Sequence, residues 1–248
     1  MEIKIENLTK AYGDFKAVDN MNLNIADGEL VGLLGPSGCG KSTTLFMLAG
    51  LNDPTSGHIY FGGKDVTKVA PEDREIGLVF QNYALYPHMT VEKNISYGLK
   101  NMKVPADEIK KKVDWAIDIL GLEEYRYRKP KNLSGGQRQA LTLLMATVTK
   151  PKILLLDEHT AALDPATSAK VLLLTNKIVT EQKLTAMMVT HDMQQAIDVG
   201  NRLIMMYNGQ IIYDVKGEEK KNLTVPFLLK KFEEASGSEF VNDRMLLK

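Results

Sequence analysis

The chain has 248 residues, and its 31 basic and 31 acidic side chains cancel to a formal net charge of zero, so no basic excess predicts a nucleic-acid partner. No apolar run approaches the roughly 18 residues of a membrane-spanning helix, and residues 1–6 lack the apolar segment of a signal peptide. The one cysteine, Cys39, excludes an intramolecular disulfide and fits a reducing compartment, so we expect a cytoplasmic protein that meets a membrane only through other chains.

Short strands and one helix account for the first third of the chain. Apolar residues predict strands that begin at Ile3 and that cover 21–25, 29–34, 58–61 and 76–80, with a helix over 43–49. A cluster of Asn, Asp, Pro, Ser and Gly at 52–57 predicts a turn after the helix.

The loop between the strand at 29–34 and this helix matches the pattern G-x-x-x-x-G-K-S/T. Its residues are Gly35, Pro36, Ser37, Gly38, Cys39, Gly40, Lys41, Ser42 and Thr43. Glycines let a loop wrap a phosphate with backbone N–H groups, and the helix N-terminus adds a partial positive charge. Lys41 can reach the β- and γ-phosphates of a nucleotide, and the Ser42 hydroxyl can bind Mg²⁺. The strand–loop–helix context favours this interpretation over a chance match in a glycine-rich turn.

The pattern from about residue 90 to residue 149 is mainly helical. Apolar residues recur at helical spacing over 107–120, so we expect Trp115 in this helix to serve packing rather than function. A further helix follows the residues Leu133, Ser134, Gly135, Gly136 and Gln137. The serine hydroxyl and the glycine N–H groups at this helix N-terminus could receive an anion, which would be the nucleotide of another protomer because the first loop already holds the phosphates. The alternative is an ordinary capped helix with Ser134 as the N-cap.

The next apolar strand, over 153–156, ends in two carboxylates, Asp157 and Glu158. Beside a phosphate loop, Asp157 is suited to hold Mg²⁺, directly or through water. Glu158 should point elsewhere because side chains alternate along a strand, which would let it act as a general base on an attacking water.

Strands and helices alternate again in the last third of the chain. We expect a helix over 165–182, a strand over 184–190, a helix over 193–199, and two closing strands over 202–207 and 210–214. Asn208-Gly209 between the closing strands is a strong hairpin signal. Beyond about residue 216 the sequence is charged and weakly patterned.

These patterns predict an α/β fold with a mostly parallel sheet, an N-terminal antiparallel β subdomain and an inserted α-helical subdomain at about 82–150. Ligands bind such sheets at the carboxyl ends of the strands. The loop at Gly35, the pair Asp157-Glu158 and His191 all follow strands, so we expect them at one edge.

With these motifs in hand, the chain over about residues 1–217 resembles the nucleotide-binding subunit of an ATP-binding-cassette (ABC) transporter, with Gly35–Thr43 as the Walker A loop and Leu133–Gln137 as the family signature. The resemblance implies that Asp157 and Glu158 are the Walker B pair and that Asp164 lies in the D-loop. It also implies that Tyr12 stacks on adenine, that Gln81 senses Mg²⁺ and the attacking water, and that His191 is the switch histidine. The cofactors implied are ATP and Mg²⁺.

The resemblance further implies a head-to-tail dimer, formed with a second copy or a paralogous subunit, that encloses two ATP molecules between Walker A of one protomer and the signature of the other. Transmembrane permease subunits would contact residues 82–91, where apolar and aromatic side chains should be partly exposed. Core packing of Leu85 and Val91 is an equal alternative. A substrate-binding protein is a further partner that such importers use, and the subunit would lie on the cytoplasmic face of the cell membrane.

The sequence departs from the importer pattern after Ala140. ATPases of sugar and osmolyte importers, which residues 73–91 resemble, usually have arginine at position 140, proline at position 159 and serine at position 161. This chain has Ala140, His159 and Ala161. Its residues 157–164 instead resemble a less characterised group of importer ATPases. A mixed or engineered origin would explain the two halves. His159 could titrate beside the site, although a simple loop histidine is the favoured interpretation.

Residues 218–248 should form a short helix or a flexible tail, and they are too few for the C-terminal regulatory domain of many sugar-importer ATPases. Two other functions stay open from sequence. A soluble ABC ATPase acting on nucleic acid or ribosomes typically carries coiled-coil insertions or two cassettes, neither of which this sequence shows. A nucleotide-gated module without hydrolysis is disfavoured by Glu158 and His191.

Overall fold

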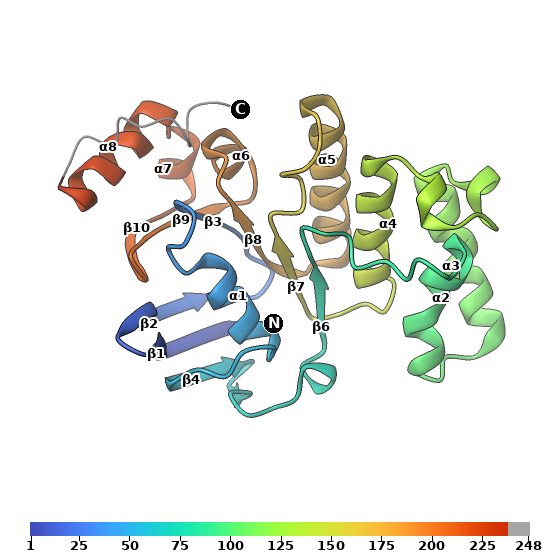
Figure 1. Ribbon diagram of the computed structural model, residues 1–248, viewed down its shortest axis with the longest axis horizontal. Coiled ribbons are helices and arrows are strands. Elements are labelled where there is room, and N and C mark those ends of the chain that lie inside the picture. The colour runs from blue at the N-terminus through green and yellow to red at the C-terminus, as the bar shows by residue number, and fades with distance from the viewer. Residues whose placement is uncertain (238–248) are drawn as a thin grey trace.

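Two β-sheets and eight α-helices build the protein in a computed structural model that describes residues 1–237 (Figure 1). The strands are β1 (Ile3–Tyr12), β2 (Phe15–Ile25), β3 (Leu30–Leu34), β4 (Ser56–Phe61), β5 (Lys64–Asp65), β6 (Ile76–Val79), β7 (Ile153–Asp157), β8 (Thr185–Thr190), β9 (Arg202–Tyr207) and β10 (Gln210–Lys216). The helices are α1 (Lys41–Ala49), α2 (Val91–Asn101), α3 (Ala106–Leu120), α4 (Gly135–Thr147), α5 (Pro165–Gln182), α6 (Met193–Asp198), α7 (Glu218–Lys221) and α8 (Val225–Ser236).

The smaller sheet is antiparallel, with strand order β2-β1-β4-β5. Its strands alternate in burial: Ile3 and Ile5 face the interior, whereas Lys4 between them faces solvent. This alternation is what one face packed on a core requires. The N-terminal antiparallel unit predicted from the sequence is therefore confirmed.

The larger sheet has strand order β10-β9-β3-β8-β7-β6 and is parallel except for the pair β9–β10. Strands β3 and β7 are buried along their whole length, in keeping with the continuous apolar sequence of strands covered on both faces. The hairpin between β9 and β10 turns at Asn208 and Gly209, whose φ angles are 46° and 78°. Two consecutive positive φ angles are typical of the predicted tight turn.

Helix α1 lies between the two sheets (Figure 1). Leu45, Met47 and Leu48 on this helix are fully buried in a core that includes Ile5 of the smaller sheet and Leu155 of the larger one. Because α1 starts directly after the glycine-rich loop, this packing fixes the position of the loop over the sheet edge.

Helices α2, α3 and α4 form a lobe beyond β6, in the segment where the sequence predicted a helical block (Figure 1). The interior side of α3 carries Val113, Ala116 and Ile117, as its spacing predicted. Trp115 is 42% exposed, so the expected packing role of this side chain is wrong. Its position on the helix is about 200° from Val113, which turns it away from the buried stripe.

The chain after β10 forms α7 and α8. Leu228 and Phe232 on α8 are fully buried in a core with Leu34 and Met205, so α8 is a packed helix rather than a flexible tail. The part of the predicted tail at 238–248 lies outside the described residues. Within residues 1–237, no helix has the length and apolar character needed to cross a membrane.

Candidate nucleotide site

Neighbouring strands of the larger sheet bring the predicted motifs to one edge. In register, Leu34 at the end of β3 pairs with Thr190 at the end of β8, and Asp157 at the end of β7 pairs with Val189. The glycine-rich loop, Glu158 and His191 follow these strand ends directly. The edge is the one at which parallel sheets bind ligands.

The loop before α1 leaves its backbone N–H groups without a side-chain cap. Gly40 is the N-cap of α1 at φ 102°, and no side chain accepts a hydrogen bond at this helix end. A Cβ atom at Gly40 would lie 2.1 Å from the Ala17 carbonyl oxygen, so only glycine fits. Ser37 and Gly38 are exposed at the tip of the loop, and Pro36, Ser42 and Thr43 are half-buried. The Cys39 N–H donates to the Pro36 carbonyl oxygen at 3.3 Å, so the loop closes into a cradle whose glycine backbone could approach a phosphate.

Lys41 crosses this cradle. Its ammonium donates to the carbonyl oxygens of Gly35 at 2.7 Å and Pro36 at 2.9 Å, and its side chain is buried. Cys39 Sγ lies 3.8 Å from Lys41 Nζ, and burial raises the pKa of this thiol. The lysine is thus the cation of the loop, and Cys39 is a packed, protonated side chain rather than a reactive thiolate.

Ser42 and Asp157 meet across the gap between α1 and β7, with the serine hydroxyl donating to Asp157 Oδ1 at 2.8 Å. Burial raises the pKa of Asp157, and the bond from Ser42 opposes that shift. A hydroxyl and one carboxylate fit Mg²⁺, which uses few protein ligands and completes its shell with water and phosphate oxygens. The residues present are therefore compatible with the magnesium site predicted from the sequence.

Glu158 and His191 face each other, with 3.1 Å between Glu158 Oε2 and His191 Nδ1. Strand alternation predicted the direction of Glu158, and that reason is wrong because β7 ends at Asp157. Glu158 has a left-handed φ of 45°, so a turn rather than the strand pleat aims its side chain. The carboxylate next to an imidazole is an arrangement that can accept and relay a proton.

The signature residues begin α4, in the helical lobe apart from α1 (Figure 1). Ser134 Oγ accepts from the Gln137 N–H at 3.2 Å, and Gln137 Oε1 accepts from the Ser134 N–H at 2.8 Å. This is a capping box, so within one chain Ser134 is the helix cap that was the alternative interpretation. Gly136 lies against α5, where an added Cβ would be 2.2 Å from Thr167 Cγ2.

Tyr12, predicted to stack on adenine, lies at the end of β1 and is 53% exposed. Phe15 pairs with it across the β1–β2 hairpin and is also exposed, which gives a pair of aromatic side chains rather than one. Phe15 was not among the residues predicted from the sequence. The two-residue turn Gly13-Asp14 would have placed it opposite Tyr12.

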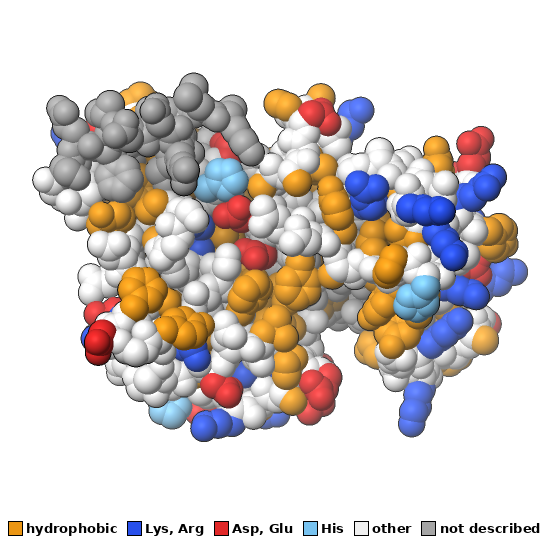
Figure 2. Space-filling model, viewed as in Figure 1, with side chains coloured by type: hydrophobic (Ala, Val, Ile, Leu, Met, Phe, Trp, Pro, Cys, Tyr) orange, Lys and Arg blue, Asp and Glu red, His pale blue; other side chains and the backbone are white. Residues whose placement is uncertain are grey.

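Gln81 is exposed just after β6, the strand that pairs with β7. In the segment 82–91, Val91 is fully buried and Leu85 is half-buried against the same core, so core packing is the outcome for both. Figure 2 shows hydrophobic and basic side chains gathered on the helical lobe that this segment enters. His88 is an exposed member of the segment, and the Tyr86 ring packs against Tyr97 at 4.6 Å.

Asp164 and His159 lie in the loop between β7 and α5. Asp164 caps α5 by accepting from the Thr167 N–H at 3.0 Å, and the hydrogen bonds with Thr167 lower its pKa. His159 is only 2% exposed, and burial lowers its pKa to about 4. His159 is therefore not a titrating group at neutral pH; it is a loop histidine, as the favoured interpretation had it, but its side chain is buried.

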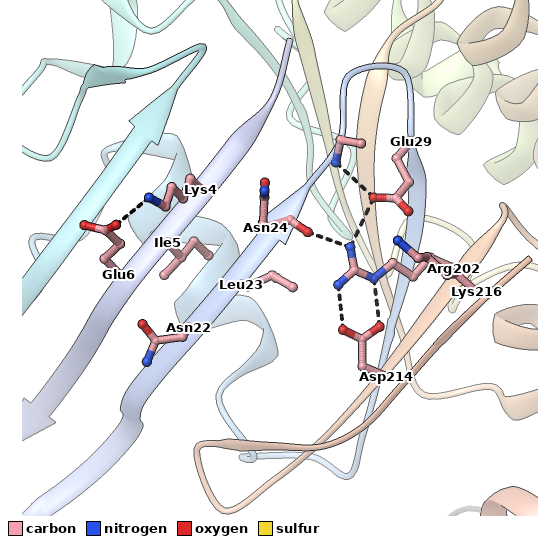
Figure 3. Close-up of a pocket in the computed structure, with 11 residues that line it drawn as sticks. Lys4, Ile5, Glu6, Asn22, Leu23, Asn24, Glu29, Arg202, Asp214 and Lys216 are labelled. Carbon is pink, nitrogen blue, oxygen red and sulfur yellow. Dashed lines mark hydrogen bonds and ion pairs between the residues drawn. The ribbon is translucent and has the colours of Figure 1, made fainter.

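An open groove of about 590 Å³ lies between the smaller sheet and the β9–β10 hairpin (Figure 3). It is separate from the sheet edge that carries the predicted motifs. Arg202 dominates it: the guanidinium donates to both Asp214 oxygens at 2.7 and 2.5 Å, to the Asn24 carbonyl oxygen at 2.6 Å and to Glu29 at 3.1 Å. All of these contacts are internal pairs, so we interpret this cluster as a tie between the two sheets.

Comparisons with known proteins identify the family of the chain. The family profile described as "ABC transporter" matches residues 18–161. The chain is 49% identical over 211 residues to the oligosaccharides import ATP-binding protein MsmX of Bacillus subtilis, covering 85% of this chain and 58% of the relative. It is 45% identical to a probable sulfate/thiosulfate import ATP-binding protein CysA of Chlorella vulgaris, covering 86% of this chain and 90% of the relative.

A solved structure shares the fold: the dimeric ATP-binding cassette MJ0796 bound to ADP and Pi has a TM-score of 0.76 and 32% identity, and the match covers 86% of this chain and 98% of that one. The chain spans only about three fifths of the length of several bacterial relatives, 58% for MsmX.

Proposed function

The chain belongs to the ABC transporter family of ATP-binding proteins, and from that premise we propose that it is the ATP-hydrolysing motor subunit of a membrane importer. The observation that carries the proposal is the meeting of two pairs at one sheet edge. Ser42 bonds to Asp157 at 2.8 Å, and Glu158 approaches His191 at 3.1 Å, directly beside the uncapped loop of α1. Phosphate cradle, cation ligands and proton acceptor are thereby within reach of one nucleotide.

The steps that these residues would perform follow from their positions. Tyr12 and Phe15 would stack on the adenine, the amides of 38–43 and Lys41 would hold the phosphates, and Glu158 would take the proton of the attacking water. His191 would orient Glu158 and the γ-phosphate, and Gln81 would report on the water and the cation. When bound at Ser42 and Asp157, Mg²⁺ would neutralise charge on the β- and γ-phosphates.

The signature would complete the site in a second protomer. Ser134 and the amides of Gly135, Gly136 and Gln137 begin a helix apart from α1, so one chain brings them to no phosphate of its own. A head-to-tail dimer would place them on the γ-phosphate of the partner's ATP, with Asp164 close to the same interface. The MJ0796 cassette is dimeric, which supports the dimer in this proposal.

Permease subunits would contact the segment 82–91, which links β6 to the helical lobe. Such a partner would hold the chain on the cytoplasmic face of the membrane, and a substrate-binding protein would serve the same importer. The transported solute is outside the proposal: relatives of nearly equal similarity carry oligosaccharide import and sulfate/thiosulfate import in their names. The cassette alone therefore does not discriminate among solutes.

Glu158→Gln tests the hydrolytic part of this proposal. Removing the general base should slow ATP turnover by about 10²- to 10⁴-fold while nucleotide affinity stays near that of the wild type, because the phosphate cradle is intact. The variant should also accumulate as an ATP-bound dimer in light scattering. Glu72→Gln, the same change at an exposed position, is the matched control. Wild-type turnover in Glu158→Gln would refute the assignment of the base.

A further inference from the structure

Glu158 has a backbone conformation that its surroundings must enforce. Its φ of 45° is in the left-handed region, which is disfavoured for a side chain larger than glycine. Two backbone hydrogen bonds hold this residue: its N–H donates to the Val189 carbonyl at 3.1 Å, and its carbonyl accepts from the Ala161 N–H at 3.0 Å. Neither bond fixes the loop that follows relative to the helices packed around it.

The next residue, His159, points into the protein and reaches α5. Its Nε2 lies 3.1 Å from Thr175 Oγ1, and both side chains are buried. The Thr175 hydroxyl donates to the Val171 carbonyl at 2.9 Å, so its single hydrogen is already used. With that hydrogen on the Val171 carbonyl, we assign the proton of the ring to Nε2, which then donates to Thr175.

In this buried position, the other ring nitrogen of His159 is left without a hydrogen bond. His159 Nδ1 has no hydrogen-bond partner among residues 1–237, although a buried polar atom is normally satisfied. An apolar side chain would fill this place without an orphaned nitrogen.

A second anchor holds the following residue to another helix. Thr160 donates to Gln195 Oε1 at 2.9 Å on α6, the helix that starts two residues after His191. Gln195 Nε2 in turn donates to Ser168 on α5 at 3.3 Å. The two residues after Glu158 are thus fastened to the two helices that flank the site.

We propose that His159 is a positioning residue for ATP hydrolysis: its Nε2–H bond to Thr175 clamps the loop after β7 onto α5 and so holds Glu158 in the strained orientation that faces His191. This inference rests on the proposed hydrolytic function. It assigns a role to a residue that contacts α5 rather than ATP.

Thr175→Val in the full chain is the decisive variant. Valine keeps the shape of threonine but removes the acceptor, so Glu158 is released while the phosphate loop is untouched. We expect kcat for ATP to fall about tenfold and KM to stay within about twofold, since small misplacements of a reacting group act on the chemical step. Thr175→Ser, which retains the hydroxyl, should keep kcat close to that of the wild type.

Thr147→Val is the matched control. Thr147 is fully buried on α4 and its hydroxyl makes the same bond to a carbonyl one turn earlier, but it holds no loop of the site. Equal losses of kcat in Thr147→Val and Thr175→Val would overturn the proposal, as would wild-type kcat in Thr175→Val. If Thr175→Val does not fold, His159→Gln, whose amide can donate to Thr175, and His159→Leu, which cannot, replace it. Wild-type turnover in His159→Leu would then overturn the proposal.

Heteronuclear NMR of the histidine ring gives a readout independent of turnover. We expect the Nε2–H tautomer of His159 in the wild type, and its loss in Thr175→Val. A mixture of tautomers in the wild type would overturn the clamp. Absence of ATP turnover in the wild-type chain, with the tautomer intact, would contradict the proposed hydrolysis instead of the clamp.

Discussion

The N-termini of α1 and α4 are both glycine-rich, yet they are built in opposite ways. Gly40 before α1 has no side chain to satisfy the first N–H groups of that helix, whereas Ser134 and Gln137 satisfy each other's N–H groups at the start of α4. Free N–H groups at a helix start attract anions, whereas the capping box of α4 already pairs the N–H groups of Ser134 and Gln137. The first end is prepared for phosphate within one chain. The second is stable alone and would meet an anion only when another protomer presents it.

The largest effect is expected from a substitution at the N-terminus of α4. Ser134→Arg should abolish ATP-dependent dimerisation in the Glu158→Gln background, because the arginine fills the space in which the partner's γ-phosphate would sit. Loss of the cap should cost only about 1 kcal/mol of folding stability, so the monomer stays folded. Light scattering measures the dimer, and a nucleotide titration shows whether monomer affinity is kept. Dimerisation as tight as in the parent would show that the signature is not at the interface.

The next largest effect is expected from a substitution at the N-terminus of α1. Lys41→Ala should weaken binding of MgATP by about thirtyfold or more, since losing one partner of a buried charge interaction costs about 2–5 kcal/mol. Calorimetry or fluorescence titration measures this affinity, with Lys64→Ala on the exposed strand β5 as the control. Unchanged affinity would mean that the cradle before α1 is not the phosphate site.

The smallest expected effect compares glycines at the two ends. Gly40→Ala should lower the free energy of unfolding by about 2–4 kcal/mol, because its Cβ meets the Ala17 carbonyl at 2.1 Å and its φ is 102°. Gly135→Ala should change it by less than about 1 kcal/mol, because its nearest contacts would be Tyr83 and Leu163 at 3.3 and 3.4 Å. Denaturant unfolding of both variants checks the difference. Equal losses of stability in the two variants would contradict the proposed difference between the loop before α1 and the N-terminus of α4.

Most of the fold follows from local patterns in the sequence. The helix 165–182 and the strand 202–207 have the observed bounds, because a proline at the first helical position and a tight Asn-Gly turn mark these ends. Boundaries were wrong where no such marker exists: β2 starts at Phe15 rather than at residue 21. Its first residues pair with β1, and that pairing depends on a neighbour rather than on the sequence of β2 itself.

The candidate site also contains features that the sequence predicts and features that it does not. The positions of the glycine-rich loop, Asp157 and Glu158 at strand ends could be predicted, because each belongs to a short contiguous motif. Three other features could not be predicted, because each depends on which residues pack around the side chain. They are the direction of the Glu158 side chain, the exposure of Trp115 and the burial of His159. Phe15 was missed because its position beside Tyr12 becomes evident only when the pairing of β1 with β2 is known.

By itself, the sequence determined which residues are candidates to hold phosphate and Mg²⁺, and in which order the strands and helices that carry them occur. These properties depend on side-chain types and on backbone periodicity within a few residues. Only the tertiary structure decided that Ser42 meets Asp157, 115 positions later, and that His159 is tied to Thr175 on α5. Such contacts form when separate elements pack around a shared core, and burial there changes the pKa and the hydrogen-bonding state of a histidine whose sequence neighbours give no sign of it.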